Sequence, residues 1–399
     1  MVFRFFPRSS WTVSVGVFLC AGLLFQVAGC GDKSTTTQPS QPPERLTGDI
    51  FIDAEPDSLN CPWHLTGPAD LAISGRGDST LTEVESGTYM LSWDRVPNLY
   101  TPFAGSLELS PGGEIHFEGL YTRDNPFSGL EFGTDATLEV VTWNLERFPK
   151  ENLETVDLVA RAVMTLDADI LALQEITEAG FFWELDKRLA DWTSVLATGS
   201  SFQINLAFLY RDSGNWTFDS DREILTGYSR EFPRSPYVME GRFNGVSVVV
   251  INNHFKCCGD NVISEETWDE ETRRRDAGVL LDEYVRTNYA DRKVIIVGDL
   301  NDSLTDSRSS NVFNVFLDAP DNWRFVDMDI AEGHPSGWSF PGWPSHLDHI
   351  LIFEPLFSAW EDQDAEVRVI PLDQGFPGGW SEYDQAISDH LPVALKLIP

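Results

Sequence analysis

The 399-residue sequence has few basic residues for its length. It contains 28 Lys and Arg against 63 Asp and Glu, which gives a formal net charge of −35 at pH 7. This imbalance argues against a basic groove as a source of nucleic-acid affinity. Phosphate substrates stay open, because salt screens surface charges beyond about 8 Å and a bound metal ion reverses the field locally. A charge-neutralising partner, a saline habitat or solubility alone explains the acidity equally well.

Long apolar runs are also scarce. Arg4 and Arg8 precede an apolar segment over residues 11–25, which is shorter than the roughly 18 residues of a membrane-spanning helix. Small residues then lead to Cys30, an order that predicts a signal peptide over residues 1–30. The segment resembles the lipobox of bacterial lipoproteins, with Cys30 as the lipidated residue; an ordinary signal peptide or a membrane anchor is the alternative. We therefore expect an extracytoplasmic protein, anchored by lipid in the bacterial cell envelope, at the outer membrane or cell surface.

Cysteine is rare as well, with five residues in the chain. Cleavage of the leader removes Cys20 and lipidation uses Cys30, which leaves Cys61, Cys257 and Cys258. An oxidising compartment favours disulfides, and both a vicinal bond between Cys257 and Cys258 and one bond to Cys61 are open. Metal binding by the vicinal pair is not expected, because no further Cys or His stands at ligand spacing.

The chain divides by composition into several parts. Residues 31–46 are rich in Ser, Thr, Gln and Pro and predict a flexible tether. Residues 47–122 consist of short alternating runs between turn residues, which predicts a small all-β sandwich. Through the segments at 66–68 and 87–93 this module resembles the PEGA-like repeats of bacterial surface proteins. A spacer or adhesive role is the expectation, carbohydrate or protein binding is the alternative, and residues 123–136 form a linker.

From residue 137 to residue 399 the pattern changes to strands that alternate with helices. Several of the predicted strands are apolar on both faces, so they lie inside and are covered by helices or a second sheet. The sequence therefore predicts one layered α/β domain. The predicted strands are 138–144, 169–175, 205–211, 246–254, 293–299, 347–353 and 391–398, and the predicted helices are 153–166, 179–191 and 266–288.

Short polar motifs stand at the ends of these strands. They are ThrTrpAsn (142–144), LeuGlnGlu (173–175), AsnAsnHis (252–254), GlyAspLeuAsn (298–301), LeuAspHis (347–349) and SerAspHis (388–390). Strand ends meet at the rim of a sheet, so these side chains are expected in one cleft. Each motif alone is typical of a satisfied strand-end residue. The ordered set instead indicates a site, and its oxygen ligands suit Mg²⁺ or Mn²⁺.

Together the six motifs resemble the endonuclease/exonuclease/phosphatase superfamily, over roughly residues 137–399. Its members include deoxyribonuclease I, exonuclease III-type repair nucleases, neutral sphingomyelinases and inositol polyphosphate 5-phosphatases. The resemblance implies a four-layer αββα sandwich and metal-dependent hydrolysis of phosphoesters. His254 occupies the position where deoxyribonuclease I and sphingomyelinases carry histidine and repair-type nucleases carry tyrosine. At this position the chain therefore resembles the DNA-repair nucleases less than the other members.

The resemblance implies roles for individual residues. Asn144, Glu175 and Asp389 would lie at the metal, with Glu175 as the principal ligand. Asp299 and Asn301 would orient or deprotonate the attacking water and contact the phosphate.

Two histidines complete the expected machinery. His390 would lie on the phosphate as a base or a positive clamp, with its tautomer fixed by Asp348. His254, or a water on the metal, would supply the proton for the leaving oxygen. Which histidine is the acid stays open, as does the choice between one metal and two.

Further side chains are candidates for substrate contact. Asn252 and Lys256 share a strand face with His254, and Trp343 belongs to an aromatic, glycine-rich segment at 337–344. That segment and a similar one at 375–380 either stack on bases, dip into a lipid interface or simply pack.

Other polar residues near the motifs are not expected to be catalytic. His349 is expected to be structural and His346 to be a rim contact. Arg273, Arg274 and Arg275 are expected on a solvated helix face, with contact of one of them with phosphate as the alternative.

The expected function is extracytoplasmic cleavage of nucleic acid, DNA first and RNA second, by a monomer. A phospholipid phosphodiesterase or phosphatase similar to sphingomyelinase is the alternative, and a non-catalytic surface binding protein is the second. Mg²⁺ or Mn²⁺ is the expected cofactor, with a structural Ca²⁺ as a further expectation. Endonuclease or exonuclease mode is left open.

Overall fold

The computed structural model describes residues 47–94, 96, 102, 104–121, 125–189, 191–199, 204–211 and 214–399. The predicted signal peptide, Cys30 and the tether lie outside the described residues. Within the described ranges no helix is long and apolar enough to cross a membrane. The three described cysteines, Cys61, Cys257 and Cys258, are free thiols, so neither expected disulfide is formed.

The N-terminal module is the predicted all-β sandwich. Its two sheets have the strand orders β4-β1-β7 and β3-β2-β5-β6. Buried and exposed residues alternate strictly in β7, so one face of that strand packs inward. Both sheets contribute to one apolar core, which includes Ile50, Trp63 and Tyr89. The strands are β1 (Thr47–Glu55), β2 (Pro62–Gly67), β3 (Leu71–Arg76), β4 (Ser79–Glu85), β5 (Gly87–Trp93), β6 (Gly105–Leu109) and β7 (Glu114–Leu120).

The larger domain is built on two six-stranded sheets. The first has the order β10-β11-β9-β8-β19-β18 and the second the order β12-β13-β14-β15-β17-β16. The first sheet contains β8 (Leu138–Phe148), β9 (Ile170–Ile176), β10 (Trp192–Leu196), β11 (Asn205–Arg211), β18 (Glu366–Val369) and β19 (Val393–Leu397). The second contains β12 (Trp216–Glu223), β13 (Tyr237–Phe243), β14 (Val246–His254), β15 (Lys293–Asp299), β16 (Trp323–Phe325) and β17 (Asp348–Phe353).

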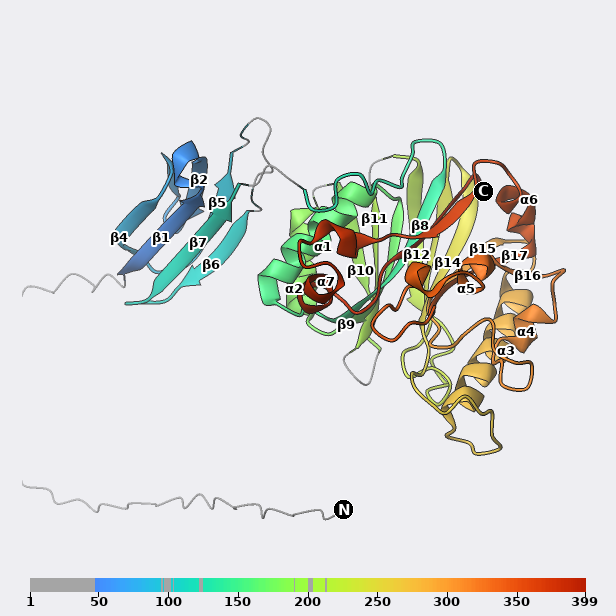
Figure 1. Cartoon of the computed structure of the whole chain (residues 1–399). Helices are drawn as coiled ribbons and strands as arrows, with labels where there is room; N and C mark the ends of the chain where they lie inside the picture. The colour runs from blue at the N-terminus through green and yellow to red at the C-terminus, as the bar shows by residue number, and fades with distance from the viewer. Residues whose placement is uncertain are drawn as a thin grey trace, which may run out of the picture. The chain divides into compact units, whose positions relative to one another are not determined.

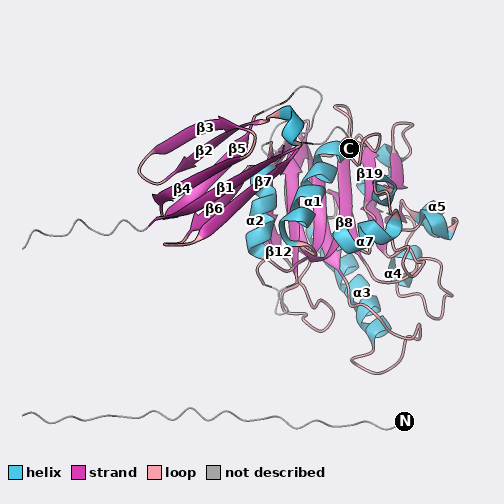
Figure 2. Ribbon diagram, turned by 60° about the vertical axis from the view of Figure 1, so that its left-hand side comes forward, coloured by secondary structure: helices cyan, strands magenta, loops and turns pink. Residues whose placement is uncertain are grey.

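Helices cover the outer face of each sheet, as Figure 1 and Figure 2 show. Helices α1, α2 and α7 share an apolar core with the first sheet, and α3 and α4 share one with the second. The helices are α1 (Asn152–Leu166), α2 (Ala179–Arg188), α3 (Glu270–Asn288), α4 (Asn314–Leu317), α5 (Met328–Ala331), α6 (Phe357–Trp360) and α7 (Trp380–Ala386). A third core lies between the two sheets. The result is the expected four-layer αββα sandwich.

Residues that follow one another along a central strand enter different cores. Val140 of β8 packs between the sheets, whereas Val141 packs against the helices. In β15, Ile295 and Ile296 divide in the same way between the inter-sheet core and the core under α3. Side chains of a strand alternate in direction, so a strand covered on both sides must be apolar throughout. This explains why the two-sided apolar runs in the sequence predicted the inner strands other than β13, which contains Glu240 and Arg242.

Helix α3 begins later than the sequence predicts, at Glu270 rather than near residue 266. Asp269 is the reason, because its side chain accepts a hydrogen bond from the backbone N–H of Thr272 at 2.7 Å. Such a cap satisfies one of the free N–H groups that every helix has at its start.

A buried ion pair lies beneath one sheet edge. His349 Nδ1 is 2.6 Å from Asp327 Oδ2, and His349 Nε2 is 2.9 Å from the carbonyl oxygen of Asp302. Both oxygens only accept hydrogen bonds, so both ring nitrogens donate and His349 is an imidazolium cation. His349 is therefore structural, as predicted. The expectation that His346 is a rim contact is wrong, because it is buried and its Nε2 lies 3.0 Å from the same Asp327 oxygen.

The pair shifts both ionisation equilibria. Burial alone would lower the pKa of His349, but Asp327 outweighs it and raises that pKa. Burial alone would raise the pKa of Asp327, but the two histidines outweigh it and lower that pKa. A raised histidine pKa stabilises the fold below about 6.5 and loses the effect as pH rises, and a lowered aspartate pKa stabilises it above about 3.9. The contribution of the pair is therefore largest between those two values.

We predict that His349→Gln lowers the free energy of unfolding by about 3–5 kcal/mol in mildly acidic solution, since it removes the cation that pairs with the buried Asp327 carboxylate. The difference from the unsubstituted protein should shrink as pH rises above about 6.5. Urea unfolding across this pH range measures it, with the exposed His334→Gln as control. A difference that does not change with pH would contradict the imidazolium assignment.

Candidate active site

The predicted polar motifs meet at one edge of the stacked sheets. Strands β8 and β9 run parallel in the first sheet, β14 and β15 run parallel in the second, and all four end at this edge. Strands β17 and β19 run antiparallel to their neighbours and therefore begin there. A cleft of about 470 Å³ opens at the edge, and the predicted residues that line it are Asn144, Glu175, His254, Asp299, Asn301, Trp343, Asp389 and His390.

The backbone bends sharply where the strands enter the cleft. Glu175 and Asn301 adopt left-handed conformations, with φ of 62° and 55°. Gly298 has φ of 144°, and a Cβ atom there would lie 2.0 Å from the carbonyl oxygen of Asn253. Only glycine fits that position, because at this φ a side chain would point into the backbone of the neighbouring strand β14. Strained backbone of this kind is common at functional sites.

Hydrogen bonds across the two sheets hold the site together. Asn144 Nδ2 donates to Asp299 Oδ2 at 3.0 Å, and so joins β8 to β15. The second oxygen of Asp299 accepts from the backbone N–H of Asn301 at 3.0 Å. His390, just before β19, places Nδ1 2.7 Å from Asp348 Oδ2 of β17, which is the expected hydrogen bond. The carboxylates of Asp299 and Asp348 are thus fixed in position from both sheets.

His390 is a cation in this environment. Burial would lower its pKa, but Asp348 outweighs burial and, with Asp299 and Asp389, raises the pKa to about 10. Its Nε2 lies 3.9 Å from Asp299 Oδ2 and 3.8 Å from Asp389 Oδ1. The ring of Phe340 covers the imidazole, with 4.7 Å between centroids. The cleft therefore contains a fixed positive charge at neutral pH.

His254 is neutral, in contrast. Burial lowers its pKa well below the ordinary value, and the nearby charges of Arg234 and His390 add to the effect. Its Nε2 lies 3.0 Å from Arg234 Nη2, and a guanidinium only donates, so this nitrogen carries no proton. The same nitrogen is 3.5 Å from Asp299 Oδ2 and 3.8 Å from Glu175 Oε1.

Arg234 is a cleft residue that the sequence did not single out. It lies between β12 and β13, in a segment with prolines at 233 and 236, and it lines the cleft. Burial lowers its pKa, while Glu175 and Asp299 act in the opposite direction. No motif marks it, and an arginine between two prolines just before a strand is the only signal in the sequence.

The carboxylates of the cleft repel one another. Burial and the neighbouring Asp348 raise the pKa of Asp299 to about 7. Burial, Glu146 and Glu175 raise the pKa of Asp389 to about 6. A divalent cation would offset this repulsion, and a donor set of carboxylate and amide oxygens fits Mg²⁺ or Mn²⁺.

The cleft is not a cage of three carboxylates. Among the described residues, two groups bring three acidic or histidine ligand atoms within 4.8 Å of one another, one around Asp327 and one around Glu271, and neither includes an expected ligand of the catalytic metal. Mg²⁺ keeps several waters and is usually held by only one or two carboxylates. Glu175, with Asn144 and Asp389 beside it, satisfies that requirement.

Two predicted substrate contacts do not face the cleft. Asn252 is fully buried, accepts from Gln174 Nε2 at 2.7 Å and donates to the carbonyl oxygen of Leu173 at 3.0 Å. It therefore ties β14 to β9 and cannot touch substrate, so the prediction of substrate contact is wrong. Lys256 does not line the cleft, and its Nζ donates to the carbonyl oxygen of Cys257 at 2.7 Å.

The arginines at the start of α3 also differ from expectation. Arg273 and Arg274 are buried, so a solvated face is the wrong interpretation for both. Arg274 donates to Asp302 Oδ2 at 2.8 Å and to the carbonyl oxygens of Lys256 and Cys258 at 2.7 Å. It links the chain after β14 to the chain after β15, and it lines the cleft.

The two aromatic segments behave differently. Trp343 is 79% exposed at the cleft mouth, on a tip closed by a bridge between Phe340 and Ser345. The base of this tip is held at Ser339, whose carbonyl oxygen accepts from the N–H of Leu391 at 2.7 Å. In the second segment Phe376 and Trp380 pack against the core under α7, so the packing interpretation holds there.

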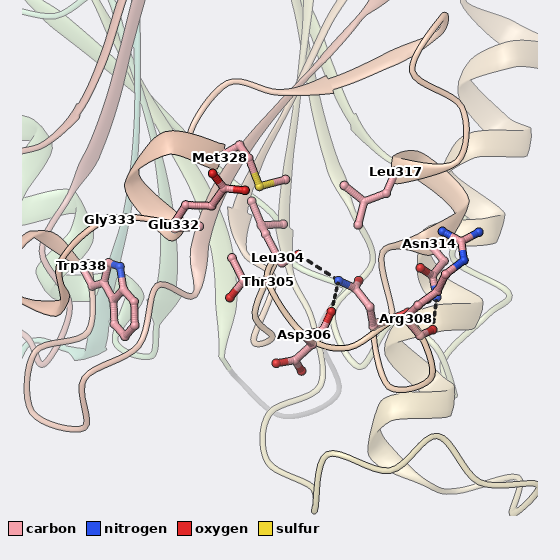
Figure 3. Close-up of a pocket in the computed structure, with 12 residues that line it drawn as sticks. Leu304, Thr305, Asp306, Arg308, Asn314, Leu317, Met328, Glu332, Gly333 and Trp338 are labelled. Atoms are coloured by element: carbon pink, nitrogen blue, oxygen red, sulfur yellow. Dashed lines mark hydrogen bonds between the residues drawn. The ribbon is translucent and has the colours of Figure 1, made fainter.

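A further pocket of about 650 Å³, drawn in Figure 3, shares the lining residue Asp306 with the cleft. Trp338 and Met328 stand on one side of it and Leu317 on the other. It holds no histidine and none of the predicted catalytic residues, so its chemistry does not make it the active site.

Comparison with known proteins agrees with this architecture. A model of the Endonuclease/Exonuclease/phosphatase family matches residues 141–390. Among solved structures, D. rerio TDP2 complexed with a single-strand DNA product is similar with a TM-score of 0.50 and 15% identity, covering 66% of this chain and 99% of that chain. A Bacteroides thetaiotaomicron mannosyl-6-phosphatase has a TM-score of 0.46 and 16% identity, covering 66% and 100%. A search of curated proteins found no match.

The structural likeness at these identities concerns the fold. The family match, by contrast, spans more than half of the chain. It runs from β8 to His390 and therefore includes all six motifs. The chain therefore belongs to the endonuclease/exonuclease/phosphatase family.

Proposed function

We propose that this protein is a divalent-metal-dependent phosphodiester hydrolase that cleaves nucleic acid, DNA before RNA, outside the cytoplasm. The observation that carries the proposal is the pairing of a cationic His390 with a buried, amide-held Asp299 in one cleft. One group suits an anionic phosphate and the other suits an attacking water.

Two cations of the cleft serve the phosphate. His390 points Nε2 into the cleft, and Arg234 is held by His254, so both can contact the non-bridging oxygens. A divalent ion held by Glu175, with Asn144 and Asp389, would add charge neutralisation when bound. Because Nε2 of His254 carries no proton, the arrangement supports His254 as the residue that positions Arg234, rather than as the acid suggested by the sequence.

Asp299 suits the role of base. Asn144 and the Asn301 N–H hold its two oxygens, so the carboxylate has one fixed orientation toward the cleft. Its pKa of about 7 lies close to neutral pH, where a general base is most effective. Asp348 has no contact with the cleft and acts through His390.

The choice of nucleic acid rests on the cleft mouth. The indole of Trp343 is free to stack on a base, an interaction worth about 1–3 kcal/mol. The TDP2 structure with a single-strand DNA product is compatible with that choice. An exposed indole also suits a lipid interface, which keeps a phospholipid headgroup as the second candidate.

We predict that a chelator abolishes hydrolysis and that added Mg²⁺ restores it.

Asp299→Ala and His254→Ala should each lower turnover at least about a hundredfold, because one removes the base and the other frees Arg234. Asp318→Asn, an exposed substitution away from the cleft, should leave turnover unchanged. Full turnover in both cleft variants would reject the assignments.

We predict that Asp348→Asn moves the alkaline limit of activity to lower pH. Asp348 holds the pKa of His390 at about 10, so the imidazolium persists well above neutral pH in the unsubstituted protein. Without the carboxylate the pKa should fall toward or below about 6.5, and the cation is lost as pH rises through that range. Profiles of kcat/KM against pH, with exposed Asp364→Asn as control, measure the shift. An unchanged alkaline limb would contradict the clamp role.

We predict that the purified mature protein cleaves plasmid DNA and leaves sphingomyelin and phosphoinositides intact. RNA belongs in the same assay, since a base-stacking mouth does not by itself distinguish the two nucleic acids. Lipid turnover without DNA cleavage would select the phospholipid alternative. Inactivity on all substrates with Mg²⁺ or Mn²⁺ present would favour a binding protein.

A further inference from the structure

Three carboxylates gather beside the start of α3, and none of them is an expected ligand of the catalytic metal. Asp260, Asp269 and Glu271 each bring an oxygen within 4.8 Å of the other two. Asp260 belongs to the loop after β14, Asp269 caps α3, and Glu271 lies in its first turn. The cluster therefore joins a long irregular loop to the end of a helix.

Each carboxylate of the cluster is held in place through one oxygen. The backbone N–H of Val262 donates to Asp260 Oδ1 at 3.1 Å, and that of Thr272 donates to Asp269 Oδ1 at 2.7 Å. The backbone N–H of Asn261 donates to Glu271 Oε1 at 2.7 Å. The acidic groups are thus fixed toward one another instead of spreading apart as like charges on a free surface would.

Glu271 provides the independent sign of a ligand. Its side chain is only 2% exposed, and its Oε2 is buried without a hydrogen-bond partner. Burial of a carboxylate oxygen without a hydrogen-bond partner is strongly unfavourable, because the oxygen loses its hydrogen bonds to water and gains none within the protein. The carboxylate also lies against Gly259, where a Cβ atom would be 2.1 Å from Oε1 and 2.5 Å from Oε2. The absence of a side chain at residue 259 therefore provides the space that the Glu271 carboxylate occupies.

The neighbouring cation does not neutralise the cluster. Arg274 Nη2 is 3.4 Å from Glu271 Oε1, but the same guanidinium donates to Asp302 Oδ2 at 2.8 Å. One positive charge is therefore shared between two carboxylates, while Asp260 and Asp269 add two further negative charges. A divalent ion would supply the missing positive charge and a partner for the free oxygen.

We propose that Asp260, Asp269 and Glu271 form a Ca²⁺ site. The donors are hard oxygens with no nitrogen or sulfur, which excludes a soft metal preference. Ca²⁺ accepts six to eight oxygens at about 2.3–2.6 Å in flexible geometry, so ligand oxygens on opposite sides of it lie roughly 4.6–5.2 Å apart. Three carboxylates within 4.8 Å fit that span, and waters or loop carbonyls complete the shell.

The site controls one wall of the cleft. Cys257, Cys258, Gly259 and Asn261, all on the loop after β14, line the cleft together with Glu271. Bound Ca²⁺ would fasten this loop to α3 and fix that wall. The ion would act through the loop and not on the reacting atoms, so its binding is independent of the proposed hydrolysis.

Calorimetric titration of the mature protein with Ca²⁺ tests the site. We expect Asp260→Asn and Glu271→Gln to weaken binding at least about tenfold, which is about 1.4 kcal/mol. Glu270→Gln is the matched control, because Glu270 is the adjacent residue in the same turn but lies 3.8 Å from Lys256 and outside the cluster. That variant should bind as the unsubstituted protein does. Asp260 is exposed, so its variant reports on the site even if the Glu271 variant folds poorly.

The catalytic metal is separated by a further variant. Glu175→Gln removes the principal expected ligand in the cleft, and it should retain Ca²⁺ binding at the new site even if hydrolysis is lost. Absence of Ca²⁺ binding, unchanged affinity in both cluster variants, or loss of binding only in the Glu175 variant would each overturn the proposal. None of these results depends on which phosphoester the protein hydrolyses.

Discussion

The site depends on polar contacts that cross from one sheet to the other. Asn144 reaches Asp299, His390 reaches Asp348 and Gln174 reaches Asn252, and in each pair the partners belong to opposite sheets or to segments entering them. Buried hydrogen bonds of this kind penalise any relative shift of the sheets, because a shift leaves polar atoms unpaired. The apolar core between the sheets supplies the attraction, and these contacts set the register.

A fixed register explains how two histidines in one cleft carry different charges. His390 faces a fully buried carboxylate, whereas His254 faces a guanidinium, and each partner comes from a different part of the chain. Groups of the same intrinsic pKa thus become an imidazolium and a neutral ring within one small volume. Desolvation lowers the pKa of both rings, and at His390 the unscreened attraction of Asp348 outweighs it.

The sequence predicted every inner strand of the larger domain except β13, and most of the cleft, and it failed where local pattern carries little information. The strands it missed include all four edge strands, β10, β12, β16 and β18, which have one open side and lack a two-sided apolar run. Arg234 was missed because only the fold brings it to His254. The role of Asn252 was predicted wrongly, because the alternation along a strand shows which residues share a face but not which of them are buried by the rest of the fold.

The tip that carries Trp343 is joined to the rest of the domain at Ser339 and closed on itself between Phe340 and Ser345. Its base supports Asp348, whose backbone N–H lies 3.3 Å from Ser339 Oγ, while the exposed tip makes no described hydrogen bond to the catalytic groups. Exchange of the residues between Phe340 and Ser345 would alter what the entrance admits and leave the chemistry intact. Descendants of this chain could therefore acquire new substrates by changing a single short hairpin.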